Sequence, residues 1–191
     1  MNYNFDNIKQ KLKTNLTPQR FLHTLGVVES AERLAVHWHA DIEKARLAAL
    51  LHDCAKFMPM EERIPCCQQH GFSISDAERD NLTLLHAKCG AVLAREEYGV
   101  EDEEIAHAII YHTTGCPGMT LLDKIIFIAD YIEPNRDKAT NLELVRKVAF
   151  ENLDLAVLLI LEDSLAFLNT KNRTIDPTTA ETFDYYKKIV T

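Results

Sequence analysis

The chain has 191 residues, of which 47% are hydrophobic and 26% charged, and its formal net charge is −8. These proportions are ordinary for a globular protein and exclude a disordered polymer, a collagen-like repeat and a disulfide scaffold. The negative charge argues against nucleic acid or a membrane surface as a partner, since both require a basic footprint. It leaves room for a small anionic ligand held through bound cations.

Neither the apolar runs nor the cysteines indicate export. No apolar run approaches the roughly 20 residues that span a bilayer, and residues 1–13 lack the apolar segment of a secretory signal. The five cysteines include no C-x-x-C pair, which favours reduced thiols over disulfides or a zinc knuckle. We therefore expect a cytoplasmic protein. The sequence does not decide its oligomeric state, and a homodimer is compatible with it.

Apolar residues recur at helical spacing along nearly the whole chain. Runs that alternate between apolar and polar residues are missing, so we expect no sheet. There is also no internal repeat and no linker. The sequence predicts an all-α fold with one domain over residues 1–191. Its core covers about residues 18–168, and a C-terminal loop and helix follow in residues 169–191.

The first helices are predicted from caps and apolar stripes. Thr17 and Pro18 begin a helix whose apolar stripe runs over residues 21–35. Residues 42–55 are apolar on almost all sides, which predicts a buried central helix. Ser75 opens a capping box. The helix that follows it is expected to carry Leu82, Leu85 and Cys89 on its inner side and to end at Gly99.

The later helices follow similar signals. Acidic residues 101–104 favour the first turn of a helix that runs to about Tyr111. Thr120 opens another capping box, and that helix must stop near Glu133, because Pro134 disfavours helical geometry in the residue before it. Further helices are expected from about Asn141, over Leu153–Leu168 and from Thr178 with Glu181 as its box partner. Loops are predicted at residues 56–59, 66–75, 113–119, 134–140 and 169–177.

Four polar residues stand inside or at the end of apolar helical stretches: His23, His52, Asp53 and Asp130. A buried imidazole or carboxylate is destabilising unless it is paired or binds a metal. These residues come from three separate predicted helices and form a nitrogen and oxygen ligand set. Such a set suits iron, manganese, cobalt, nickel or zinc, and disfavours a purely structural sulfur site.

Two further histidines, His86 and His112, lie at or near the ends of apolar stretches with small residues beside them. They could complete a second metal position with Asp53 as the bridge, or contact a substrate phosphate. The alternative is a core histidine that hydrogen-bonds a backbone carbonyl. His107 is a weaker reserve ligand.

The order H…HD…H…H…D resembles the HD-domain metal-dependent phosphohydrolases, and more narrowly the bacterial YqeK-type symmetrical diadenosine tetraphosphatases. The resemblance extends from about Arg20 to residues 173–179, and a departure lies at Cys116-Pro117, where we expect a basic residue. The segments that carry it are RFLH (residues 20–23), LHDCAK (51–56), LHAKCGA (85–91), HTTG (112–115) with Met119, and IADYIEPNR (128–136).

The resemblance implies a helical HD fold that holds one or two divalent metal ions, with iron as the expected metal. It also implies hydrolysis of diadenosine tetraphosphate in the middle of its polyphosphate chain, which gives two ADP. His23, His52, Asp53 and Asp130 would be the primary metal ligands. His86 and His112 would be second-metal ligands or phosphate contacts.

Cationic side chains complete the predicted site. Lys56, one turn after Asp53, is placed to meet a phosphate or to orient that carboxylate, so His52, Asp53 and Lys56 are the predicted catalytic residues. Substrate contacts are expected from Arg20, Lys56, His86, His112, Arg136 and Arg173. For each of these cations, ordinary surface charge is the alternative interpretation.

Two other functions remain open at this point. HD proteins with the same ligands cleave many phosphoesters, so the motif fixes the chemistry better than the substrate. A phosphohydrolase acting on a deoxynucleoside monophosphate or a cyclic nucleotide would use the same residues. A non-catalytic nucleotide sensor could use the cleft for binding alone.

Overall fold

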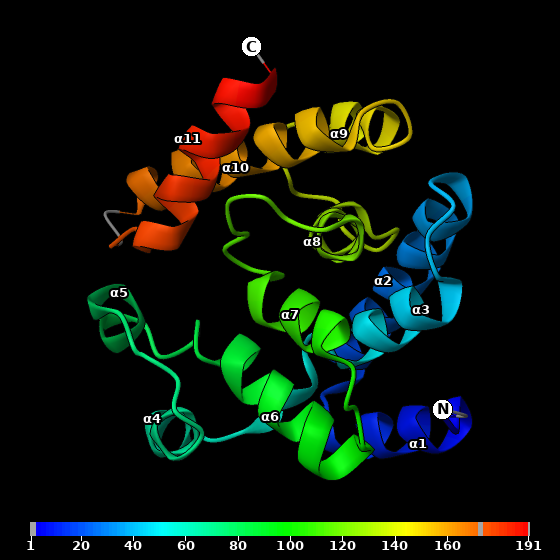
Figure 1. Cartoon of the computed structure of the whole chain (residues 1–191), viewed down its shortest axis with the longest axis vertical. Coiled ribbons are helices and arrows are strands. Elements are labelled where there is room, and N and C mark those ends of the chain that lie inside the picture. Colours follow the sequence, from blue (N-terminus) through cyan, green and yellow to red (C-terminus); the bar gives the residue numbers. More distant parts are fainter. Residues whose placement is uncertain (1–2, 172–173, 191) are drawn as a thin grey trace.

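The computed structural model describes residues 3–171 and 174–190, and within them it contains helices, turns and loops without a β-strand. The all-α expectation is therefore confirmed (Figure 1). The elements are α1 (Phe5–Asn15), α2 (Pro18–His37), α3 (Ile42–Leu51), η1 (Cys54–Phe57, a 3-10 turn), α4 (Met60–Gln69), α5 (Asp76–Asp80), α6 (His86–Tyr98), α7 (Glu103–Tyr111), α8 (Leu121–Ile132), α9 (Leu142–Val148), α10 (Leu153–Thr170) and α11 (Pro177–Val190).

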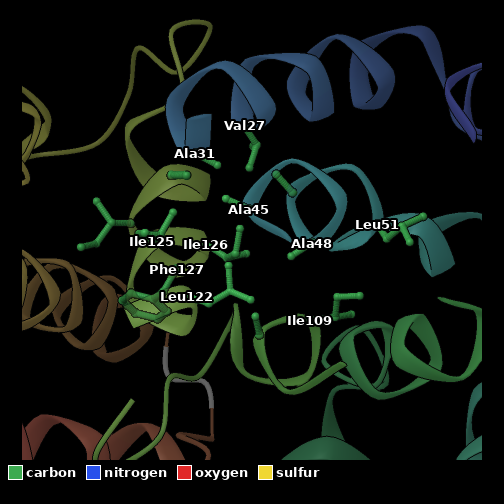
Figure 2. Close-up of a cluster of buried hydrophobic side chains, with 14 of the residues drawn as sticks. Val27, Ala31, Ala45, Ala48, Leu51, Ile109, Leu122, Ile125, Ile126 and Phe127 are labelled. Atoms are coloured by element: carbon green, nitrogen blue, oxygen red, sulfur yellow. The ribbon is translucent and has the colours of Figure 1, made fainter. Parts of the chain in front are cut away.

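The core lies where α2, α3, α7 and α8 meet. Helix α3 packs against the other three, and α8 also packs against α10. Figure 2 shows the side chains that fill this space, all of them buried. They come from α2 (Val27, Ala31), α3 (Ala45, Ala48, Leu51), α7 (Ile109) and α8 (Leu122, Ile125, Ile126, Phe127).

Outer helices support this centre from three sides. Helix α6 packs against α7 and η1, and α4 packs on α6. Helix α1 covers α2 and α3 near the N-terminus, while α9, α10 and α11 form a separate group beyond α8 (Figure 1). No helix in the described residues is long and apolar enough to cross a membrane.

Several helix ends follow the predicted caps. The Thr17 hydroxyl accepts a hydrogen bond from the amide of Arg20, with Pro18 in the first turn. Ser75 and Thr120 each form a complete capping box, with Glu78 and Asp123 as partners. Helix α8 ends at Ile132, directly before Glu133, as Pro134 requires.

The central helix is shorter than predicted. Helix α3 ends at Leu51, and His52 and Asp53 form a turn before η1 begins. The backbone of Asp53, with φ −109° and ψ 14°, leaves the helical region. The same turn aims the two polar side chains away from the helix axis. The predicted loop at residues 56–59 is accordingly occupied in part by η1.

The helix predicted after Ser75 is wrong as one unit. It divides into α5 and α6, because Asn81 adopts an extended backbone and residues 82–85 form turns. The buried guanidinium of Arg63 stabilises this break by donating to the carbonyls of Leu82 and Thr83. Leu82 therefore lies outside the helix that carries Cys89.

Further corrections concern the outer helices and one side chain of α2. Helix α4 extends to Gln69, into the loop predicted at residues 66–75, and buries Arg63 and Cys67. Helix α1 was not foreseen. Helix α10 continues to Thr170, and α11 begins at Pro177 with the Asp176 carboxylate accepting from the Thr178 amide, so the predicted Thr178–Glu181 box is wrong. Leu22, assigned to the apolar stripe of α2, is 53% exposed.

Candidate metal centre

Four histidines and two aspartates from separate elements converge at one place. His23 lies on α2 and Asp130 on α8, while His52 and Asp53 follow α3. His86 begins α6 and His112 follows α7. The structure thus brings together all six of the metal ligands predicted from the sequence. Two overlapping groups of donor atoms, each within 4.8 Å, share His52: one adds His23 and Asp130, the other Asp53 and His112.

Three of the imidazoles are oriented in the same way. The Nδ1 atoms of His52, His86 and His112 each lie 2.6–2.7 Å from the carbonyl oxygen three residues earlier. Since a carbonyl only accepts, Nδ1 must carry the proton in each ring. In a neutral ring the Nε2 atom then presents its lone pair to the cluster, the arrangement that a hydrogen bond from Nδ1 to a carbonyl enforces on metal-binding histidines; a protonated ring instead donates from Nε2 to a carboxylate.

His23 is held by two carboxylates instead. Its Nδ1 lies 3.3 Å from Oε1 of Glu133, and its Nε2 lies 3.1 Å from Oδ1 of Asp130. The Nε2 atoms of His23 and His52 are 3.4 Å apart. Glu133 is itself 4% exposed and accepts a hydrogen bond from the amide of Asn135. It is a site residue that the sequence analysis did not single out, because an acidic residue before a proline is common at a helix end.

Asp53 stands between the two groups of histidines. Its Oδ2 faces His52 at 3.5 Å and His23 at 3.9 Å, and its Oδ1 faces His86 at 3.1 Å and His112 at 3.5 Å. The carboxylate is almost fully buried. Its two oxygens are therefore directed toward different donor groups, which is the geometry that a bridging ligand needs.

The charges of the cluster shift several pKa values. Burial opposes ionisation of Asp53, but the charge of His52 and hydrogen bonds from His112 and His52 hold its pKa well below its usual range. Burial likewise works against charge on Asp130, whose pKa is lowered by the hydrogen bond from His23 and by nearby histidines. At neutral pH both carboxylates are ionised.

The histidines differ from one another. Burial lowers the pKa of His86 to about 4, with the charge of Asp53 opposing it. For His23, burial is outweighed by the hydrogen bond to Asp130, so its pKa is raised above 6.5. His86 is therefore neutral at pH 7, and His23 takes up a proton at a higher pH than His86 does.

Of the predicted cationic contacts, three surround the cluster. Nη1 of Arg20 lies 2.7 Å from Oδ2 of Asp53, and Nζ of Lys56 lies 3.7 Å from its Oδ1. Arg136 reaches the carbonyl and the carboxylate of Asp130 through Nη2. Arg173 lies outside the described residues.

The remaining histidines stand apart from the centre. His107, the reserve ligand, contacts Asp123 instead, and His70 caps the end of α4 and contacts Glu96. Thr113 was not predicted as a site residue, yet its hydroxyl lies 3.1 Å from Nε2 of His112. Its place directly after a predicted ligand was the available signal.

Two cavities flank the cluster. One of about 540 Å³ is lined by His112, Thr113, Asp130 and Arg136, together with residues of α8 and α10. The other, of about 320 Å³, lies between α6, α7 and the start of α11, and Thr113 also lines it. Residues of the cluster line only the larger cavity, whereas Thr113, directly after His112, lines both.

The HD domain family matches residues 20–135, the segment that contains all six clustered residues. The chain belongs to the HD-domain family. Two relatives are named symmetrical bis(5'-nucleosyl)-tetraphosphatase: a Halalkalibacterium halodurans protein, 45% identical over 92% of both chains, and a Bacillus subtilis protein, 42% identical over 91% of this chain and 92% of the relative. They place this HD protein in the symmetrical tetraphosphatase group.

A solved structure agrees with the HD assignment. The crystal structure of a Clostridium acetobutylicum protein, described as a predicted HD superfamily hydrolase involved in NAD metabolism, is 40% identical to this chain. The match has a TM-score of 0.94 and covers 98% of each chain. The likeness therefore includes α1 and α11, which lie beyond the HD segment.

Proposed function

We propose that this HD protein hydrolyses diadenosine tetraphosphate to two ADP at a divalent-cation centre held by His23, His52, Asp53 and Asp130. The observation that carries the proposal is the convergence of two imidazole Nε2 atoms and two ionised carboxylates from α2, α8 and the turn that follows α3. The names of the relatives supply the substrate class. The geometry supports the chemistry, as follows.

The donor set fits a cation. Nε2 of His86 and Nε2 of His112 lie 3.1 Å apart, while both rings use their Nδ1 protons on backbone carbonyls. Two lone pairs at this distance repel unless a positive charge lies between or beside them. A divalent cation supplies that charge; when bound in such a site, it lowers the pKa of a coordinated water and stabilises charge on phosphoryl oxygens.

We propose iron as the native cation, with room for two ions. Imidazole and carboxylate ligands suit iron, although manganese, cobalt, nickel and zinc accept the same set. The two donor groups that share His52, and the two oxygens of Asp53 that face different histidines, support a site for two ions, both of which Asp53 would help to hold. In that arrangement His86 and His112 complete the second position.

The two cavities support cleavage in the middle of a symmetrical substrate. Diadenosine tetraphosphate has two nucleoside arms, and a protein that cuts it centrally must hold one arm on each side of its reacting phosphates. The cavities of about 540 Å³ and 320 Å³ both reach Thr113 beside His112. Each nucleoside arm would therefore have its own cavity, with the phosphates at the cluster.

Cationic side chains then neutralise and position the phosphates. Lys56 lies beside Asp53 at the cluster, and Arg136 lines the larger cavity. The buried Nε of Arg136 has no hydrogen-bond partner in the described part of the chain, so this guanidinium retains a donor for a phosphate oxygen. Arg20 is already paired with Asp53, which favours a role in holding that carboxylate.

The redox state of the cysteines supports a proposal for the cellular compartment. All five are free thiols in the structure. Unpaired cysteines in this number fit a reducing compartment, and we propose that the protein acts in the cytoplasm.

A product assay tests the proposal. Protein loaded with iron or manganese without oxygen should convert one diadenosine tetraphosphate to two ADP, as read by anion-exchange chromatography. His52→Ala and Asp53→Asn should lower turnover by at least about 100-fold, because each removes a ligand. His70→Gln, a change in an exposed histidine at the end of α4, should leave turnover unaltered. Formation of AMP and ATP, or turnover of nucleoside monophosphates alone, would contradict the proposal.

A further inference from the structure

A second group of metal-binding side chains lies outside the centre described above. His107 on α7, Asp123 on α8 and Cys116 in the intervening loop each offer one donor atom, and these atoms all lie within 4.8 Å of one another. Nδ1 of His107 is 2.9 Å from Oδ1 of Asp123. In the chain, His107 precedes His112 and Thr113, and Cys116 and Asp123 follow them.

Two of these three side chains are buried, and a backbone hydrogen bond holds the carboxylate in place. Cys116 is buried and Asp123 is 1% exposed, while the His107 side chain is 43% exposed. Oδ2 of Asp123 accepts a hydrogen bond from the backbone amide of Thr120 in the capping box. This bond fixes the carboxylate and leaves its Oδ1 directed at His107. Protein thus encloses the donor atoms of Cys116 and Asp123, while the His107 side faces solvent.

The donor chemistry differs from that of the HD centre. One thiol, one imidazole and one carboxylate form a mixed sulfur, nitrogen and oxygen set, which suits zinc with three protein ligands and an open fourth position. Burial and the charge of Asp123 raise the pKa of the Cys116 thiol to about 11. The free thiol is therefore a poor nucleophile, which makes a redox or catalytic role for it less suited to this place than ligation.

We propose that His107, Cys116 and Asp123 bind a second kind of divalent cation of the zinc class, separate from the HD centre. On binding, the thiol loses its proton to solvent and sulfur forms the metal bond. The ion would join α7 to α8 and tie down the loop that contains His112 and Thr113. It thereby stabilises the position of two residues at the proposed reaction site without touching the substrate.

Cobalt(II) gives a direct test, because a cobalt–thiolate bond absorbs in the near ultraviolet and cobalt bound only to nitrogen and oxygen does not. The donor groups of the HD centre include no thiol, and Cys54, which follows Asp53 in the chain, directs its sulfur to the carbonyl of Gly90. Asp53→Asn protein, titrated with cobalt(II) under reducing conditions, should therefore develop the thiolate band with one equivalent of cobalt at this site.

Variants then assign the band. Cys116→Ser should abolish it, and His107→Gln should weaken cobalt affinity at least about tenfold; because His107 is partly exposed, that variant remains decisive if Cys116→Ser does not fold. Cys67→Ser is the matched control, since Cys67 is a buried thiol in a separate group, with its sulfur 3.7 Å from that of Cys89. The proposal is overturned if the Asp53→Asn protein develops no band. It is also overturned if the band is lost in Cys67→Ser but kept in Cys116→Ser or His107→Gln.

Discussion

Arg20 and Asp53, 33 positions apart in the chain, form an ion pair at the edge of the proposed metal centre, with Nη1 2.7 Å from Oδ2. The arginine lies on α2 and the aspartate after α3, so the pair also joins two helices of the core. Asp53 offers both of its oxygens to histidines as well. Arg20 is thus the neighbour that fixes the plane of the carboxylate.

Arg20→Met should weaken binding of the divalent cation by about 10–100-fold, because the change frees Asp53 to rotate out of its ligating position. Arg20→Lys keeps the positive charge but lacks the planar guanidinium, so its metal affinity should fall between those of Arg20→Met and the parent protein. Metal titration by calorimetry measures the affinity. A raised KM with unchanged metal affinity would instead assign Arg20 to the phosphate.

Gly26→Ala should disturb His23 from a distance. A Cβ at position 26 would overlap the carboxylate of Glu133 and lie 3.2 Å from Cδ of Pro134, which cannot rotate away. Displaced Glu133 no longer orients the His23 ring.

We expect a loss of about 10–100-fold in metal affinity or activity for Gly26→Ala, and a similar loss for Glu133→Gln. Thermal unfolding of both variants, measured with a chelator present, serves as the control for general damage. Activity and metal affinity equal to those of the parent would show that Glu133 has no part in the centre.

The stability of the metal-free protein should depend on pH through His86. Its pKa in the folded protein is about 4, against 6.5 in an unfolded chain. Between these values the unfolded chain binds a proton that the folded chain refuses, so the free energy of unfolding falls as pH falls from about 6.5 to 4. His23 has the opposite sign: its raised pKa contributes stability below pH 6.5 that is lost as pH rises through the folded value.

Urea unfolding in the presence of a chelator, repeated from pH 7.5 to 4.5 on about half-unit steps, measures this dependence. His86→Gln should flatten the decline below pH 6.5, because it removes the titrating group. An equally steep decline in the variant would assign the effect to other residues of the cluster.

Ile126→Ala should cost about 2–5 kcal/mol of unfolding free energy, since this fully buried side chain fills the space between α8 and its neighbours (Figure 2). Leu144→Ala on α9 is the control: Leu144 is 48% exposed and should change stability by less than about 0.5 kcal/mol. Chemical denaturation of both variants makes the comparison. Equal losses would indicate that α8 does not organise the core.

Local signals allowed the helices with clear caps to be predicted, and tertiary contacts account for the failures. The Ser75 and Thr120 boxes need only residues three positions apart. The break between α5 and α6 depends on Arg63, which reaches across from α4 to the carbonyls of Leu82 and Thr83. A guanidinium some twenty residues away leaves no trace in the periodicity of the segment it interrupts.

The residues of the candidate site likewise fall into those that local sequence signals predict and those that only tertiary contacts reveal. His23, His52 and Asp130 could be singled out because an imidazole or carboxylate in an apolar helix needs a partner. Glu133 could not, since its contact with His23 spans 110 positions and an acidic residue before a proline is common at a helix end. The pairing of Arg20 with Asp53 likewise appears only when α2 and α3 pack together.

Anomalous diffraction at the absorption edge of the bound metal tests the central claim most directly. Crystals of protein loaded with iron or manganese without oxygen should show an anomalous peak about 2.0–2.3 Å from Nε2 of His23 and His52 and from the carboxylates of Asp53 and Asp130. A second peak beside His86 and His112 would identify the bridged pair. A fully loaded crystal with no peak among these side chains would contradict the account.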